Sequence, residues 1–225
     1  MLQKMNEGIK TMEKPNTVVF CFGRMQPVTR GHEKMVKRVV SEAKRHQADH
    51  VVFLSQTQKL PDNPLAWHYK RNFAKAAFPG INISEDTEIK TPYQALEKLA
   101  ESYDNIIFVC GDDRVKQFSS MADYAKEWGV KSFMTESAGA RRTVSDIDDV
   151  TCISASVARD AAKAGYFAAF LSYMPANITR KQAADMYNKL RSEMGIEESP
   201  EELNKEADEY RQGSLNGEFI YTGWG

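Results

Sequence analysis

The fold is decided by one stretch near the N-terminus, Val18-Val19-Phe20-Cys21-Phe22-Gly23-Arg24-Met25-Gln26-Pro27-Val28-Thr29-Arg30-Gly31-His32. Its first five residues are all apolar, which is typical of a buried strand, and residues 33–45 carry apolar side chains at helical spacing. The stretch therefore predicts a strand that turns through a glycine-containing loop into a helix. The first N–H groups of a helix are unpaired and its dipole is positive there, so this turn is suited to hold a phosphate.

The rest of the chain repeats this strand–helix pattern. Further strands are expected over residues 50–55, 105–110 and 130–134, with a weaker one over 81–89, and helices over 65–78, 91–103 and 114–128. Such alternation predicts an α/β fold, a Rossmann-like parallel sheet flanked by helices. Because parallel strands end at one edge of a sheet, the loops 23–32, 55–64 and 111–114 should line one cleft.

The C-terminal part is predicted to be helical. Ser154 is a suitable N-cap for a helix, and two more helices are expected over residues 165–174 and 179–194. We therefore divide the chain into an N-terminal arm (1–16), a main domain (17–175) and a C-terminal helical extension with a tail (176–225).

Composition excludes several classes of protein. The 225 residues carry a formal net charge of −1, which argues against nucleic acid as a partner. The chain shows no apolar run of the ~20 residues that a membrane helix needs, and its polar start lacks the apolar core of a signal peptide. Three cysteines, Cys21, Cys110 and Cys152, form no CxxC pair and are expected to be buried reduced thiols. These features predict a cytoplasmic protein.

Two short motifs, far apart in the chain, carry candidate chemistry. The first is Thr29-Arg30-Gly31-His32, and the second is Ser154-Ala155-Ser156-Val157-Ala158-Arg159. Taken alone, a histidine at this position is typical of a helix cap or a surface residue, and the second motif is typical of a capped helix with an exposed arginine. Together the two motifs are far more specific.

The pair resembles the signatures of the HxGH nucleotidyltransferase superfamily, which includes cytidylyltransferases, pantetheine phosphate adenylyltransferases and nicotinamide mononucleotide (NMN) adenylyltransferases. The resemblance covers about residues 18–194. Gly23-Arg24-Met25-Gln26-Pro27 is similar to the G-R-F-Q-P opening of archaeal-type NMN adenylyltransferases, and Gly111-Asp112-Asp113 resembles a G-x-D nucleotide-binding loop. With Ala138-Gly139-Ala140-Arg141 included, the pattern is similar to phage-encoded cytidylyltransferase-like proteins. The chain departs from the common form by having Thr29 for His and Ser156 for Thr.

The resemblance implies a transferase in which an acceptor phosphate attacks the α-phosphorus of a nucleoside triphosphate and pyrophosphate leaves. It implies catalytic roles for His32, Thr29 and Arg159. His32 would donate a hydrogen bond to an α-phosphate oxygen, and Thr29 would offer its hydroxyl. Because threonine carries no charge, positive charge at this site must come from His32, Arg24, Arg30 or Lys34. The residues expected to bind nucleotide or phosphate are Gly23, Arg24, Gly31, Gly111, Asp113, Ser154 and Ser156.

The acceptor pocket and the metal are also expectations from this resemblance. Lys59 and Trp67 fall where the family's acceptor pocket forms, although Trp67 is at least as consistent with a buried helix aromatic. Mg²⁺ is expected to be carried with the nucleotide and held more by phosphates than by protein. Asp146, Asp148 and Asp149 lack the spacing of a calcium loop and read as a solvated acidic segment, so no protein metal site is predicted.

Three functions remain open from the sequence. Adenylyl transfer to an NMN-like acceptor is favoured by residues 23–27, and cytidylyl transfer to a phosphorylated alcohol or sugar is the alternative. A third possibility is a catalytically silent fold that docks through its C-terminal tail. The tail carries Phe219, Ile220, Tyr221 and Trp224, which suit either a homo-oligomer or protein partner, or packing back onto the chain's own domain.

Overall fold

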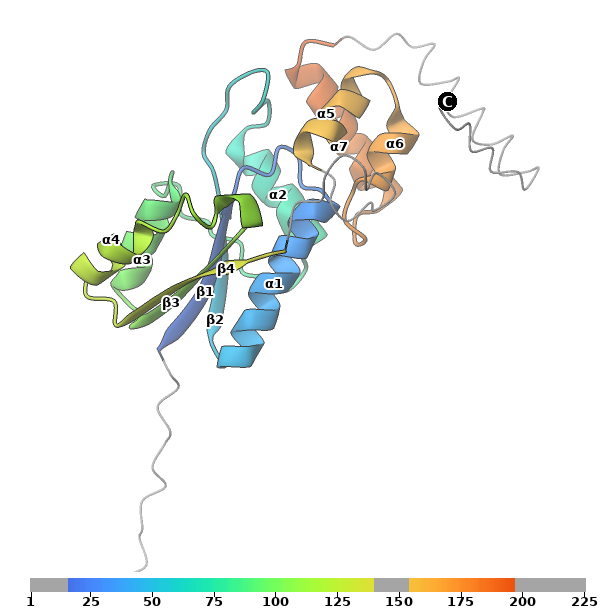
Figure 1. Cartoon of the computed structure of the whole chain (residues 1–225). Helices are drawn as coiled ribbons and strands as arrows, with labels where there is room; N and C mark the ends of the chain where they lie inside the picture. The colour runs from blue at the N-terminus through green and yellow to red at the C-terminus, as the bar shows by residue number, and fades with distance from the viewer. Residues whose placement is uncertain (1–15, 140–153, 197–225) are drawn as a thin grey trace, which may run out of the picture.

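The structure, a computed structural model, describes residues 16–139 and 154–196. It contains four strands, β1 (Thr17–Gly23), β2 (Asp49–Leu54), β3 (Asn105–Cys110) and β4 (Ser132–Ser137), all parallel and in the order β2-β1-β3-β4. The helices are α1 (Arg30–His46), α2 (Trp67–Ala77), α3 (Pro92–Ala100), α4 (Met121–Glu127), α5 (Ala155–Lys163), α6 (Phe167–Ser172) and α7 (Arg180–Glu193). The predicted α/β fold with a parallel sheet is confirmed (Figure 1).

Helices cover both faces of the sheet, which is why its central strands contain unbroken apolar runs, residues 18–22 in β1 and 106–110 in β3. Along β1, Val18 and Phe20 point to a cluster shared with α3 and α4, whereas Val19 and Cys21 point to a cluster shared with α1 and α2. The two helix layers stand on opposite sides of the sheet in Figure 1. A strand buried on two faces cannot alternate apolar and polar residues, so an unbroken apolar run indicates it.

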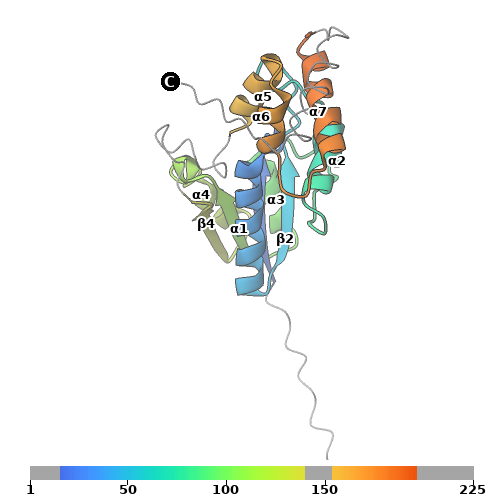
Figure 2. The ribbon, with the colours of Figure 1, turned by 90° about the vertical axis from the view of Figure 1, so that its right-hand side faces the viewer.

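The C-terminal helices belong to the same core as α1 and α2. Ala162 of α5, Phe170 of α6 and Leu190 of α7 are buried in the cluster that contains Val19 and Val36. Figure 2 shows α7 alongside α2, and Lys189 of α7 lies over the Tyr69 ring of α2. The predicted domain boundary at residues 175/176 stays a prediction. The predicted arm (1–16), apart from Asn16, and the tail over residues 197–225 lie outside the described residues.

Several predicted elements have different bounds. The weak strand over 81–89 is reduced to a single bridge between Val52 and Ile83. The helix predicted over 114–128 is split into a 3-10 turn, Asp112–Arg114, and α4, which begins at Met121. The segment over 81–89 has only three apolar residues, which is a weak strand signal. The segment over 114–128 has apolar residues throughout, but residues 115–120 form turns between the 3-10 helix and α4, so periodicity did not reveal this interruption.

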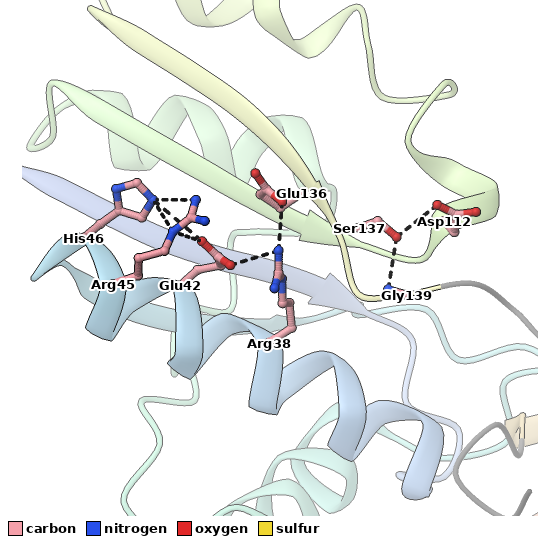
Figure 3. A network of polar contacts seen from close by, with 8 residues as sticks. All are labelled: Arg38, Glu42, Arg45, His46, Asp112, Glu136, Ser137 and Gly139. Atoms are coloured by element: carbon pink, nitrogen blue, oxygen red, sulfur yellow. Dashed lines mark hydrogen bonds and ion pairs between the residues drawn. The ribbon is translucent and has the colours of Figure 1, made fainter.

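A polar network fixes the edge strand β4 and the loop beyond it (Figure 3). The buried carboxylate of Glu42 on α1 pairs with Arg38 at 2.9 Å and with Arg45 at 3.0 Å, and Arg38 also contacts Glu136 of β4 at 3.1 Å. Ser137 Oγ donates to Asp112 Oδ1 at 3.0 Å and accepts from Gly139 N at 3.0 Å. The loops that follow β3 and β4 are therefore held side by side.

Two of the predicted reduced cysteines, Cys21 and Cys110, are buried free thiols, and Cys152 lies outside the described residues. Burial raises the pKa of the Cys21 thiol to about 12. Within the described ranges, the helices are too short or too polar to cross a bilayer.

Candidate active site

A cavity of about 450 Å³ opens at the carboxyl ends of β1 and β3. The chain runs from β1 to β2 on one side and reaches β3 on the other, so this is the point where strand order reverses and where ligands bind in such sheets. Each of the three predicted loops contributes to the lining, with Arg24 from the first, Asp62 from the second and Asp113 from the third.

The N-terminus of α1 forms one wall of the cavity. Thr29 is the N-cap residue of the helix, and its backbone N–H donates to His32 Nδ1 at 3.1 Å. Because Nδ1 accepts this hydrogen bond, the proton of the neutral imidazole is on Nε2. Burial, and then the nearby Arg24 charge, lower the pKa of His32 to about 4. The site therefore holds a neutral histidine whose Nε2–H is a hydrogen-bond donor.

Thr29 has a geometric role that differs from the predicted one. Its side chain is fully buried, and its Oγ1 lies 3.0 Å from His32 Nδ1. Thr29 thus contacts the imidazole through both its backbone and its hydroxyl. In the free protein it orients His32.

The N-terminus of α5 forms the facing wall. Ser154 is the extended N-cap residue, and its Oγ lies 2.7 Å from Ser156 Oγ. Both serines and Ala155 line the cavity. In Figures 1 and 2, α5 lies beyond the first turn of α1. Residues from the N-termini of both helices line the cavity, so two positive helix ends share it.

Arg159 joins three segments of the site. Its guanidinium is buried and donates from Nη1 to Gln26 O at 2.9 Å and from Nη2 to Asp62 Oδ1 at 3.2 Å. Burial lowers the pKa of Arg159, and the Asp62 carboxylate opposes this shift. The arginine lines the cavity and also ties α5 to the loops after β1 and β2.

The remaining residues predicted to bind nucleotide or phosphate also line this cavity. Gly31 belongs to the first turn of α1, and Arg24 is exposed to solvent at the loop after β1. A side chain at Gly23 would approach Met25 to 3.2 Å. One at Gly111 would come within 2.8 Å of Asp113 Oδ1, so the absence of a Cβ lets this carboxylate fold over the backbone. The structure brings together ten predicted residues, Gly23, Arg24, Thr29, Gly31, His32, Gly111, Asp113, Ser154, Ser156 and Arg159.

The structure leaves four predicted residues outside the cavity lining, namely Arg30, Lys34, Lys59 and Trp67. Lys59 is exposed in the loop after β2, where its backbone pairs with Asn63. Trp67 packs against the core with the Arg71 guanidinium 5.2 Å from its ring centroid. Arg30, read from sequence as a cation of the phosphate loop, instead donates from Nε to Met174 O at 3.1 Å. Helical geometry turns Arg30 toward α6, away from the wall that Gly31 and His32 form.

Two further residues organise the site and were not singled out from the sequence. Gln26 is buried, donates to Thr57 O at 3.2 Å and to Leu65 O at 3.0 Å, and accepts from Leu65 N at 2.8 Å. Lys70 is buried on α2 and donates to Arg24 O and Ser55 O. Gln26 stood in the motif that carries the resemblance, but a lysine on a helix gives no signal of burial.

Within the described part of the chain, no cluster of three or more His, Cys, Asp or Glu side chains could hold a metal ion. The acidic run at Asp146, Asp148 and Asp149 lies outside the described residues.

Comparisons with known proteins give distant structural neighbours, with 21 matching chains. No protein-family model and no curated protein matches the chain. The chain is similar in structure to a candidate nicotinate-nucleotide adenylyltransferase from Vibrio parahaemolyticus, with 19% sequence identity over 76% of this chain and 98% of that one and a TM-score of 0.48. The likeness to phage-encoded proteins stays a prediction. The case for function rests on the cavity itself.

Proposed function

We propose that the protein is a nucleotidyltransferase, which moves a nucleoside monophosphate from a nucleoside triphosphate to a small phosphorylated acceptor. The observation that carries this proposal is the convergence of two helix N-termini, one with His32 and one with Ser154, Ser156 and Arg159, on one cavity of about 450 Å³. A single phosphate needs only one such anion site, whereas facing sites suit a chain of phosphates.

In the proposed reaction, a phosphate oxygen of the acceptor attacks the α-phosphorus. The bond between the α-phosphorus and the bridging oxygen to the β-phosphate breaks, and pyrophosphate leaves with that electron pair. No covalent enzyme intermediate is needed, so the protein contributes positioning and charge stabilisation.

Each side chain has a role that follows from its geometry. His32 donates its Nε2–H to an α-phosphate oxygen as negative charge builds there, with Thr29 holding the ring in that tautomer. Arg159 and the first-turn N–H groups of α5 stabilise the leaving pyrophosphate. Asp113, beside Gly111, is the group proposed for the ribose or base.

Mg²⁺ fits this scheme as part of the nucleotide. The described cavity lining includes two carboxylates, Asp62 and Asp113, and Asp62 pairs with Arg159 at 3.2 Å. Phosphate oxygens would supply most ligands, and the ion would add positive charge at the phosphates.

We infer adenylyl transfer to an NMN-like acceptor as the first choice, supported by the likeness of residues 23–27 to archaeal-type NMN adenylyltransferases. Cytidylyl transfer to a phosphorylated alcohol or sugar is the alternative. The silent, docking function rests on the tail, which lies outside the described residues. Deletion of residues 213–225 should change oligomer mass or partner capture if the tail docks.

The decisive experiment measures pyrophosphate release. The protein is incubated with Mg²⁺, ATP or CTP, and a panel of phosphorylated acceptors including NMN. We expect release with one nucleotide–acceptor pair and a loss of at least about 100-fold in His32→Ala, because an oxyanion donor is removed. His68→Ala, which changes an exposed histidine of α2, is the control and should keep full activity. No release with any pair, or unchanged release in His32→Ala, would overturn the proposal.

A further inference from the structure

Lys70 is a cation buried behind the wall of the candidate active site. Lys70 is 0% exposed, and its ammonium donates hydrogen bonds to Arg24 O at 3.1 Å and to Ser55 O. Arg24 directly follows β1, and Ser55 directly follows β2. Both residues line the cavity, so Lys70 joins the ends of two neighbouring strands where they meet it.

The acceptors of Lys70 are neutral, which is unusual for a buried ammonium. Among the residues that the structure describes, no carboxylate lies within ion-pair distance of Nζ. Burying an unpaired charge is costly, and burial lowers the pKa of Lys70 to about 8. A methionine would avoid this cost, but it could not donate to two carbonyls.

The cavity in front of Lys70 is already positive. Arg24 is exposed on its wall, and this charge contributes to the lowered pKa values of both His32 and Arg159. A further cation is unfavourable in an empty site of this kind. It is favourable when a polyanion binds, since each positive charge then gains an opposite charge.

We propose that Lys70 is a positioning residue for the phosphate chain of the substrate. It holds the backbone of Arg24 and Ser55 at the cavity wall, and the bound phosphates are its counter-ion. This inference rests on the proposed function, but it concerns anion binding rather than bond cleavage.

The test uses inorganic tripolyphosphate as the probe and isothermal titration calorimetry on the full chain. We expect Lys70→Met to weaken binding at least tenfold and Lys70→Arg, which keeps the charge, to stay within threefold of the unmodified protein. Lys75→Met removes the same charge from an exposed position of α2 that pairs with Glu85, and should leave the affinity unchanged. A folded Lys70→Met protein with unchanged affinity, or an equal loss in Lys75→Met, would overturn the proposal.

A second measurement does not depend on the Met variant folding. In unmodified protein labelled at lysine Cε, the Lys70 resonance, assigned by its absence in Lys70→Arg or Lys70→Met, should shift when tripolyphosphate is added. An unmoved resonance at saturating tripolyphosphate would overturn the inference. The two proposals can fail separately. If tripolyphosphate binding depends on Lys70 but the protein releases no pyrophosphate, only the proposed function is contradicted. If the protein releases pyrophosphate but tripolyphosphate binding does not depend on Lys70, only the proposed role of Lys70 is contradicted.

Discussion

Replacing His32 with Asn measures how much the buried histidine contributes to the pH dependence of the free energy of unfolding. Asparagine offers Oδ1 near the place of Nδ1, so the Thr29 N–H keeps an acceptor, but the side chain cannot take up a proton. In the folded protein, burial and Arg24 lower the pKa of His32 to about 4, whereas an unfolded histidine titrates near ~6.5. Between these values only the unfolded chain binds the proton, so stability is full above pH ~6.5 and falls as the pH drops toward ~4.

The size of the effect follows from the two pKa values. At pH 5, protonation favours the unfolded state about 30-fold, or about 2 kcal/mol, and at pH 7 the effect is about 0.2 kcal/mol. Urea denaturation at pH 7 and pH 5, followed by circular dichroism, measures the free energy of unfolding. All other titratable groups are shared by the two proteins, so their difference reports on His32.

We expect the unmodified protein to lose about 2 kcal/mol more than His32→Asn between pH 7 and pH 5. His68→Asn, at an exposed position of α2, is the control and should lose as much as the unmodified protein. Equal losses in the unmodified protein and His32→Asn would refute the neutral histidine, and with it the Nε2–H donor of the proposed mechanism.

Three further substitutions test the contacts around the cavity. Gln26→Leu removes three side-chain hydrogen bonds, two of them fully buried, and should lower the free energy of unfolding by about 3 kcal/mol in urea denaturation. Gln58→Leu removes one partly buried bond and should lower it by about 1 kcal/mol or less; similar losses in both would contradict this account. Asp62→Ala removes a carboxylate that competes with the ligand for Arg159, and should tighten triphosphate binding by up to about fivefold in calorimetry. Asp160→Ala removes a nearby exposed carboxylate that pairs with Lys163, and should leave the affinity unchanged. Weaker binding in Asp62→Ala would show that the Asp62 carboxylate contacts the ligand instead. Arg159→Met should weaken triphosphate binding more than nucleoside monophosphate binding, and equal losses would argue against its leaving-group role.

Local patterns were sufficient for the elements that carry the site. The apolar run before Gly23 predicted β1, and the run before Gly111 predicted β3, because burial on both faces of the sheet demands such runs. Thr179 was predicted as a helix start, and its side chain accepts from Gln182 N. These features depend on residues that are neighbours in sequence, so one chain is enough to find them.

The cleft could also be predicted, since parallel strands bring their following loops to one edge. His32 and Arg159 are 127 positions apart, yet both line it. Their pairing was recognised through a family resemblance, because spacing alone carries no information about contacts at such separation. Helix bounds near 114–128 failed for the opposite reason: tertiary contacts, rather than local periodicity, shape that segment.

Amino-acid order alone thus specified the strong apolar strands, most of the helices and the edge at which they meet, because local propensity and two-faced burial act over a few residues. It did not specify the segments over 81–89 and 114–128. Only the tertiary structure decided which side chains at that edge line the cavity and which ones pack or hydrogen-bond elsewhere. The Arg30 side chain donates to Met174 O just beyond α6, Trp67 packs against the core, and Lys70 donates to the carbonyl of Arg24, 46 positions away in sequence. In each case the partner of the side chain is set by distances between residues that are far apart in sequence, and these distances are fixed only when the chain has folded.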